Sequence, residues 1–380
     1  MDIDGGGDYL TIQEGIDAAA FGDTVLVYPG RYNEWLTMGA DQDGVVLASR
    51  DGADSTTVHG LGVFASPLLL IEDAGPSTRV CGFTFENNRV NGHGAAVRGL
   101  SSSFTLEDCI IQACDADGAG GGVHLYYPDG VVVRGCVIRD CWSREGGGLD
   151  TSGGSAVVED TEFHDNWVTA FNGVDGGAVA VWGDILVRRC LFERNDSMPS
   201  SGNAIYASGP SVVSVEECGF HDQQGPAINF HGASLTITGS IFTENGYPTF
   251  PGCVIRVSST SAEDIAVTDN VFFANRDPVL HVYAGAPPLF SGNSVDPNGH
   301  HVIDIGEGAN AGTLNATGNW WGTIDSEEIA DLIWDCTDTL SVDMCVDFSD
   351  WCVDTSCAGH VTGVGEAQRE SWGRIKSKYR

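Results

Sequence analysis

Residues 265–275 read Ile-Ala-Val-Thr-Asp-Asn-Val-Phe-Phe-Ala-Asn, and residues 235–245 read Leu-Thr-Ile-Thr-Gly-Ser-Ile-Phe-Thr-Glu-Asn. Both segments contain an alternating apolar strand, then a small polar residue, then Phe two residues later and Asn three residues after the Phe. Residues 185–195 follow the same pattern, and residues 213–223 follow it with Gln in place of the final Asn. Self-similarity of this kind is typical of proteins built from stacked repeats.

Two columns of residues stay in register along the chain. The small polar residue recurs in steps of 22 to 30 residues, and the second column follows it by five residues, while the loops between them vary in length. A coil of about 26 residues cannot bury a hydrophobic face alone, so the coils must stack as parallel rungs about 4.8 Å apart. We expect both columns to form internal ladders that hydrogen-bond to the backbone of neighbouring coils. The small polar column reads Cys109, Cys136, Thr161, Cys190, Cys218, Ser240, Asn270, Asn293 and Asn319, and the second reads Asn88, Cys114, Cys141, Asn166, Asn195, Gln223, Asn245, Asn275 and Asn298.

The same motifs carry a resemblance to known families. Phe163–Asn166 and Gly176–Val179 resemble the Phe-x-x-Asn and Gly-Gly-Ala-Val repeats of polymorphic outer-membrane proteins. Segments within residues 8–32 and 318–351 resemble the caps of bacterial right-handed β-helix repeat proteins with the pectin-lyase-like fold. That group includes lyases, esterases, epimerases and non-enzymatic surface proteins, so the resemblance implies a fold and not an activity.

We therefore expect an all-β, single-domain, right-handed parallel β-helix with a cap at each end. Residues 1–60 should form an N-terminal cap with an amphipathic helix and the first strands, and residues 61–325 the coils. Residues 326–365 should form a Cys-rich C-terminal cap. Residues 366–380 form a basic tail, which we expect to act in sorting or docking and to contribute nothing to the coil stack.

Charge and cysteine content limit the partners and the compartment. The formal net charge is -35, which disfavours nucleic acid and anionic membranes as partners. No apolar run is long enough to span a membrane. Twelve Cys favour an oxidising compartment, so we expect a secreted or cell-surface protein. The residues after Met1 lack the pattern of a signal peptide, and we expect this sequence to begin at the mature domain.

Ten of the twelve cysteines fall into two groups. Three pairs lie on adjacent rungs, where they could form disulfides or pack as reduced thiols. The last four lie in a segment of little regular pattern, where disulfides would compensate for a thin core. We favour bridges in this second group. The pairs are Cys109 with Cys136, Cys114 with Cys141 and Cys190 with Cys218, and the last four are Cys336, Cys345, Cys352 and Cys357.

The second strand of each coil should present two outward columns, which supply the candidate site residues. The first column reads Arg98, His124, Asp150, Ala180, Tyr206, Asn229, Arg256, His281 and Asp304, and the second reads Tyr126, Ser152, Trp182, Ser208, His231, Ser258 and Tyr283. We expect both columns to be exposed. Aromatic rings among them would stack on sugars, which makes His124, Tyr126, Asp150, Trp182, Tyr206, Asn229 and His231 the candidate ligand-binding residues.

A polysaccharide lyase needs a base for the sugar C5 proton, an acid for the leaving oxygen and a cation for the uronate carboxylate. Arg256, His281 and Tyr283 could fill these roles and are the candidate catalytic residues. The alternative is an ordinary polar surface.

No cofactor is required by the pattern, although calcium could bind clustered carboxylates. The candidate ligands are Asp2, Asp4 and Asp8 in one group, and Asp115 and Asp117 in another. The alternative for both groups is a set of solvated acidic loops.

Three classes of function remain. The first is a non-catalytic surface or matrix protein that presents an elongated face to a polysaccharide. The second is a polysaccharide lyase acting on an extracellular uronate-containing glycan. The third is a self-associating subunit of a filament or surface array. We favour the first, because coil packing explains every strongly periodic position.

Overall fold

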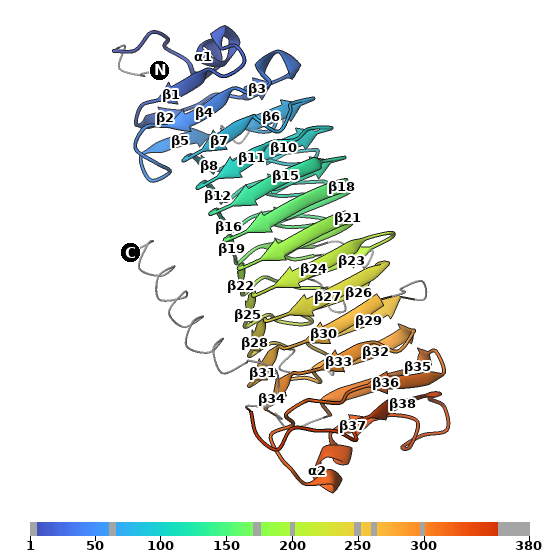
Figure 1. Cartoon of the computed structure of the whole chain (residues 1–380). Helices are drawn as coiled ribbons and strands as arrows, with labels where there is room; N and C mark the ends of the chain where they lie inside the picture. The colour runs from blue at the N-terminus through green and yellow to red at the C-terminus, as the bar shows by residue number, and fades with distance from the viewer. Residues whose placement is uncertain are drawn as a thin grey trace.

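The structure is a computed structural model that describes residues 6–60, 66–169, 176–197, 202–246, 252–259, 264–296 and 301–355. These residues form a single-domain, all-β solenoid, the right-handed parallel β-helix that the repeat predicts. Figure 1 shows the coils arranged in chain order in one elongated stack. The basic tail, residues 366–380, lies outside the described residues.

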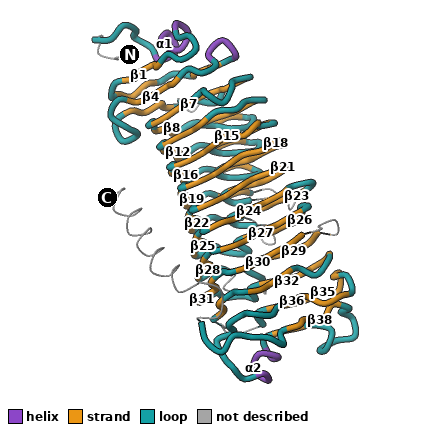
Figure 2. The backbone as a smooth tube through the Cα atoms, in the orientation of Figure 1, coloured by secondary structure: helices purple, strands orange, loops and turns teal. Residues whose placement is uncertain are grey.

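The described strands form three sheets, in which strands of successive coils pair in parallel. Figure 2 shows these strands side by side along the stack. Sheet A contains β1 (Thr24–Val27), β3 (Leu36–Met38), β4 (Val46–Ser49), β6 (Leu69–Glu72), β7 (Arg79–Cys81), β10 (Val97–Leu100), β11 (Thr105–Glu107), β14 (Val123–Tyr126), β15 (Asp129–Arg134), β18 (Leu149–Glu159), β21 (Val179–Arg188), β23 (Ile205–Ser208), β24 (Val212–Glu216), β26 (Ile228–His231), β27 (Ser234–Thr238), β29 (Ile255–Ser259), β30 (Asp264–Thr268), β32 (Leu280–Gly285), β33 (Leu289–Ser291), β35 (Ile303–Ala309), β36 (Gly312–Asn315), β37 (Ile333–Trp334) and β38 (Met344–Asp347). Sheet B contains β2 (Gly30–Tyr32), β5 (Thr56–His59), β8 (Thr84–Glu86), β12 (Ile110–Gln112), β16 (Val137–Arg139), β19 (Glu162–His164), β22 (Leu191–Glu193), β25 (Gly219–His221), β28 (Ile241–Thr243), β31 (Val271–Phe273) and β34 (Ser294–Val295). Sheet C contains β9 (Arg89–Val90), β13 (Asp115–Ala116), β17 (Trp142–Ser143) and β20 (Trp167–Val168).

A short helix lies near each end of the coil stack. Helix α1 (Ile12–Ala18) begins at Thr11, whose hydroxyl accepts a hydrogen bond from the backbone N–H of Glu14, and it buries Ile12 and Ile16. Helix α2 (Ser326–Asp331) begins at Asp325 and buries Ile329, and a 3-10 turn, η1, spans Ala40–Gln42. Helices placed there suit the need to cover the unpaired strands of an open solenoid end. Among the described residues, no helix has both the length and the apolar character needed to cross a bilayer.

The interior contains a ladder of aromatic rings. Phe192, Phe220 and Phe242 stack nearly parallel, with ring centroids 4.9 and 4.6 Å apart. Phe163 and Phe272 extend the stack at centroid distances of 5.0 and 4.9 Å. Because each ring comes from the same position of its coil, the ladder fixes the register of successive coils.

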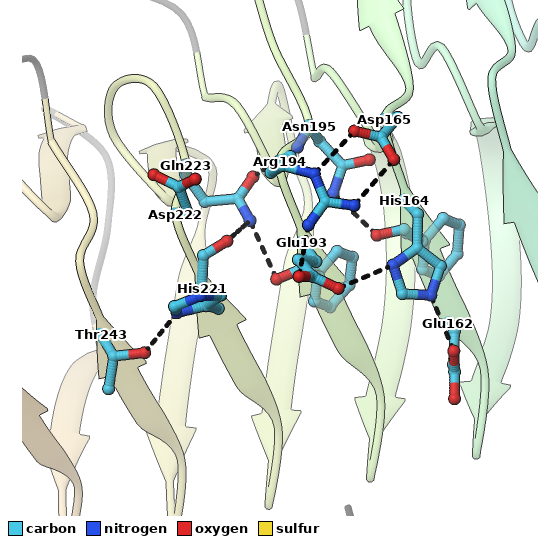
Figure 3. A network of polar contacts seen from close by, with 12 residues as sticks. Glu162, His164, Asp165, Glu193, Arg194, Asn195, His221, Asp222, Gln223 and Thr243 are labelled. Carbon is cyan, nitrogen blue, oxygen red and sulfur yellow. Dashed lines mark hydrogen bonds and ion pairs between the residues drawn. The ribbon is translucent and has the colours of Figure 1, made fainter. Parts of the chain in front are cut away.

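The described members of the predicted polar ladders are internal, as expected, and Asn298 lies outside the described residues. The Asn195 side chain donates to the backbone carbonyl of Phe163 at 2.9 Å and accepts from the backbone N–H of Asn166 at 3.1 Å. The backbone N–H of Asn195 in turn donates to the side chain of Gln223 at 3.2 Å. Figure 3 shows this ladder beside the ion pairs of the same coils, such as Arg194 with Asp165. Each ladder residue therefore satisfies backbone groups that would otherwise be buried without partners.

The cysteines separate into the two expected groups. The six Cys on adjacent rungs, in three predicted pairs, are buried free thiols. Cys336 and Cys345 form a disulfide in the C-terminal segment, and Cys352 is also disulfide-bonded. The rung cysteines therefore pack as small apolar groups. The predicted bridging of the C-terminal segment is confirmed for Cys336, Cys345 and Cys352, while Cys357 lies outside the described residues.

Candidate functional site

The register of the first outward column is confirmed. His124 of β14 pairs with Arg98 of β10 on one side and with Asp150 of β18 on the other. The pairing continues without a shift through Ala180, Tyr206, Asn229, Arg256, His281 and Asp304. Sequence spacing alone therefore predicts which of these residues are neighbours.

The expected exposure of this column is wrong for its central part. His124 is 3% exposed and Asp150 is 4% exposed, and Tyr206 and Asn229 are also buried. The cause is the Gly-rich turn that precedes each strand, which packs against the outward side chains. A Cβ built at Gly146 would lie 3.1 Å from the Cβ of Asp150.

The second outward column is exposed at its aromatic positions. Tyr126 is 46% exposed and Trp182 is 53% exposed, and Tyr283 is similarly open to solvent. The register of Tyr283 differs from the prediction, because the pairing shifts after Val257 and places Ser258 opposite Ala284. Tyr283 therefore lies at an irregularity of β32 and not in line with Ser258.

Strands β14, β18, β21 and β23 form a shallow groove of about 350 Å³ across these columns. Tyr126 and Tyr127 lie edge to face with ring centroids 4.7 Å apart. Gly153 has positive φ, and a Cβ there would lie 2.8 Å from the Tyr127 ring, so glycine allows that ring to pack closely. The groove is lined by Tyr126, Tyr127, Glu145, Asp150, Ser152, Gly153, Ala180, Val181, Trp182, Tyr206 and Ser208.

Asp150 and His124 form an unusual buried pair in the wall of the groove. His124 Nε2 lies 3.4 Å from Asp150 Oδ2, and the Ser152 hydroxyl donates to the same oxygen at 2.9 Å. Burial raises the pKa of Asp150 to about 8, against a weaker opposing effect of the Ser152 hydrogen bond. Burial, with smaller contributions from the nearby His93 and Arg98, lowers the pKa of His124 to about 3. At neutral pH Asp150 is therefore a carboxylic acid beside a neutral imidazole.

A second carboxyl group, Glu145, lines the same groove from the turn before β18. Glu145 is an exposed residue, but the atoms around its carboxyl displace part of the water there, and this desolvation raises the pKa of Glu145. The turn is anchored, because the backbone carbonyl of Glu145 accepts from Gly120 N–H at 2.8 Å and from the Ser143 hydroxyl at 2.7 Å. Neither Glu145 nor Tyr127 was predicted as a site residue, because neither belongs to an outward column. The position of Glu145 was the available signal, because Glu145 directly precedes three glycines and then β18, the strand that carries Asp150.

The candidate catalytic residues are brought together further along the same face. His281 Nδ1 lies 2.8 Å from Asp304 Oδ2, and the Arg256 guanidinium lies over the Tyr283 ring, 4.8 Å from its centroid. The rings of His281 and Tyr283 have centroids 6.1 Å apart. One coil before Arg256, His231 donates from Nδ1 to the backbone carbonyl of Ser258 at 3.0 Å, and burial lowers the pKa of His231.

The candidate calcium ligands are less well gathered. Asp2 and Asp4 lie outside the described residues, and Asp8 is exposed. Asp117 lies 3.4 Å from the Arg89 guanidinium, which a cation there would have to displace, and burial raises the pKa of Asp115. In the part of the chain that the structure describes, no three His, Cys, Asp or Glu side chains gather to hold a metal ion.

Comparisons with known proteins agree on the fold. The family model described as "Right handed beta helix region" matches residues 74–197 and 183–320. No curated protein matches the chain in sequence.

Three solved structures are similar to the chain. The catalytic unit of a thermostable GH87 α-1,3-glucanase from Streptomyces thermodiastaticus superposes with a TM-score of 0.54 at 16% identity, over 94% of this chain and 70% of that one. An alginate lyase from Paenibacillus sp. has a TM-score of 0.39 at 12% identity, over 89% and 96% of the two chains. A PL6 family polysaccharide lyase from Pseudopedobacter saltans has a TM-score of 0.39 at 12% identity, over 90% and 91%. The glucanase likeness concerns the fold, and the two lyase likenesses add nothing to it.

Proposed function

The chain belongs to the family of proteins with a right-handed β-helix region, and from that premise we propose that it binds an extracellular polysaccharide on the outward side of its coils. The observation that carries the proposal is the groove of β14, β18, β21 and β23, where exposed aromatic rings lie beside Asp150 and Ser152. Flat amphipathic rings suit the faces of sugar rings, and a few polar groups in a mostly preformed groove fix orientation.

Secretion or surface attachment is part of the same proposal. The Cys336–Cys345 disulfide supports it, since structural disulfides persist mainly in oxidising compartments. The Phe-x-x-Asn repeats similar to those of polymorphic outer-membrane proteins also fit a surface role. The net charge of -35 opposes binding to nucleic acid and favours neutral glycans or those held by local cations.

Glycan binding is tested with a panel of neutral and uronate-containing polysaccharides in native affinity gels. Trp182→Ala should weaken binding about tenfold or more, because a stacked aromatic ring contributes on the order of 1 kcal/mol beyond its buried area. Trp167→Ala is the matched control, since Trp167 is also an exposed Trp but lies on β20 of sheet C. Equal affinity of the Trp182 variant and the control would contradict the proposal.

A second candidate function is cleavage of a uronate-containing glycan by β-elimination, and the Arg256 cluster favours it. Arg188 and Arg194 pair with carboxylates, whereas Arg256 has no carboxylate at ion-pair distance among the described residues. An unpaired guanidinium next to a His–carboxylate pair suits a sugar carboxylate. His281 would take the C5 proton, Arg256 would stabilise the carboxylate charge, and Tyr283 would protonate the leaving oxygen. Ultraviolet absorbance of unsaturated products is the assay.

A further inference from the structure

Asp150 differs from the other buried carboxyl groups of the described chain. Glu159, at the far end of the same strand, is also buried, and it contacts the guanidinium groups of Arg188 and Arg189. Asp335 is buried and accepts hydrogen bonds from the backbone N–H groups of Thr337 and Val346. Both are therefore compensated as carboxylates, as buried charges usually are.

Asp150 has neither kind of compensation. Within the described ranges its carboxyl contacts the hydroxyl of Ser152 and the imidazole of His124, and Ala180 occupies the next rung. The charged groups around Asp150 do not offset a negative charge. Glu145 is itself acidic, and the positive charge of Arg98 lowers the pKa of His124 without directly affecting Asp150. The site therefore keeps the carboxyl group of Asp150 protonated. Burying this polar group costs free energy, and the packing of the coils does not require it.

The imidazole beside Asp150 is also held in a neutral form. The His93 ring lies tilted against the His124 ring with centroids 4.7 Å apart, and His93 Nδ1 accepts from the backbone N–H of Ala119 at 2.9 Å. Among the described residues, Nδ1 of His124 is buried and has no hydrogen-bond partner. His124 therefore keeps Nε2 toward Asp150 and leaves an unused polar atom, which is an unusual arrangement for a purely structural histidine.

Asp150 borders a groove and not the core of the solenoid. Asp150 lines the groove together with Glu145, and exposed Tyr126 and Trp182 lie on the rungs before and after it in the second column. Both carboxyl groups therefore border the same groove as these rings. Glycoside hydrolysis uses two carboxyl groups beside a sugar-binding groove, and burial holds one of the two present here, Asp150, as an acid.

We propose that this groove hydrolyses glycosidic bonds, with Asp150 as the acid that protonates the leaving oxygen and Glu145 as the carboxylate that activates water. The inference rests on the proposed glycan binding and adds a reaction to it. It uses a different part of the face from the Arg256 cluster.

The step is balanced with water as the co-reactant. The bond between the anomeric carbon and the bridging oxygen breaks, and the proton of Asp150 passes to that oxygen, which leaves as a hydroxyl group. A water molecule adds to the anomeric carbon and gives its proton to Glu145. Exchange with solvent then returns a proton to Asp150 and removes one from Glu145. One glycosidic bond and one water become a new reducing end and a new hydroxyl group.

The test measures reducing ends released from each glycan that the full chain binds, with heavy-oxygen water to follow the incorporated oxygen. Asp150→Asn and Glu145→Gln should each slow release by about 100- to 10,000-fold, the usual contribution of general acid–base catalysis, while affinity in native gels is retained. Asp150→Asn replaces a neutral acid with a neutral amide of the same shape and should fold. Asp184→Asn is the matched control, since Asp184 is exposed on the Trp182 strand outside the groove lining, and it should leave the rate unchanged.

A pH profile adds a readout that a structural role would not give. Release should fall above about pH 8 as Asp150 loses its proton, and this limb should be absent from the residual activity of Asp150→Asn.

The outcomes separate this inference from the proposed function. A glycan that is bound but yields no reducing ends would overturn hydrolysis and leave binding intact. Unchanged rates in Asp150→Asn or Glu145→Gln would also overturn it. Failure to bind any glycan of the panel would overturn both proposals. Unsaturated products that depend on His281 would instead support the second candidate function.

Discussion

His124 and Asp150 face each other on adjacent rungs, with the imidazole Nε2 3.4 Å from the carboxyl Oδ2 and both side chains almost completely buried. An imidazole and a carboxyl group in this geometry would form an ion pair if both were charged. However, 3.4 Å is long for a charge-assisted hydrogen bond, and burial shifts the pKa of each group toward its neutral form. We conclude that the pair is neutral at pH 7, which avoids desolvating two charges.

A neutral pair predicts a specific dependence of stability on pH. The folded-state pKa of Asp150, about 8, lies above its ordinary 3.8, so the free energy of unfolding falls as pH rises between these values. The pKa of His124 is lowered from 6.5 to about 3, so His124 has the opposite effect between those values. The two effects oppose each other up to pH 6.5. From pH 6.5 to 8, Asp150 is the one group of this pair that still changes the free energy of unfolding. We expect that free energy to fall by about 2 kcal/mol over the interval, or about 1.4 kcal/mol per pH unit.

Denaturant unfolding of wild type and Asp150→Asn at pH 6.5 and 8 measures this loss. The variant has no proton to lose at this position, so its stability should change less over the interval. Asp184→Asn should behave as the wild type, because Asp184 is exposed. Parallel pH profiles of wild type and Asp150→Asn would show that Asp150 is ionised in the folded state.

The internal ladder predicts a second effect on stability. Asn195→Leu removes one donor and one acceptor from the coil turns, leaving the Phe163 carbonyl and the Asn166 N–H without that partner. The loss should be about 1–3 kcal/mol, the usual cost of a buried unpaired polar group. Asn310→Leu is the control, because Asn310 is exposed beside β35. If both variants unfold at the same denaturant concentration, the ladder contributes little.

The sequence predicted the register of the site better than its surroundings. The neighbours of Arg98, His124 and Asp150 were predictable because internal ladders fix the coil register, and register determines which side chains meet. The burial of His124 and Asp150 was not predictable, since it depends on how a turn of variable length packs over the strand. Glu145 was missed for the same reason. The position of Tyr283 was wrong because a local shift in pairing leaves no signal in the alternating pattern.

The second candidate function predicts the behaviour of the His281 cluster. If the chain cleaves a uronate glycan by elimination, His281→Ala should reduce the formation of unsaturated product by about 100-fold or more, because the base is lost. Folding should be unaffected, since His281 is partly exposed. His221→Ala is the control. His221 and its partner Thr243 both lie on sheet B, whereas His281 lies on sheet A. Equal rates in the two variants would remove the cluster from consideration.

The glycine-rich turn before β18 packs against Asp150 through Gly146. Gly146 has φ of +59°, and a Cβ there would lie 2.3 Å from the carbonyl oxygen of Leu149. Gly146→Ala must therefore move backbone, at a cost of about 1–3 kcal/mol for a residue forced into this conformation. The displaced turn should carry Glu145 away from the groove and admit water to Asp150, which lowers the pKa of Asp150 toward its ordinary value.

Two measurements follow from the same variant. Its unfolding midpoint should be lower than that of wild type, and its loss of stability between pH 6.5 and 8 should shrink, because a hydrated Asp150 is already ionised at pH 6.5. Gly92→Ala is the matched control, since a Cβ at Gly92 meets nothing within 4 Å in the corresponding turn of an earlier coil. A Gly146 variant that is destabilised but keeps the full pH-dependent loss would show that the strand neighbours, and not the turn, hold Asp150 in its protonated form.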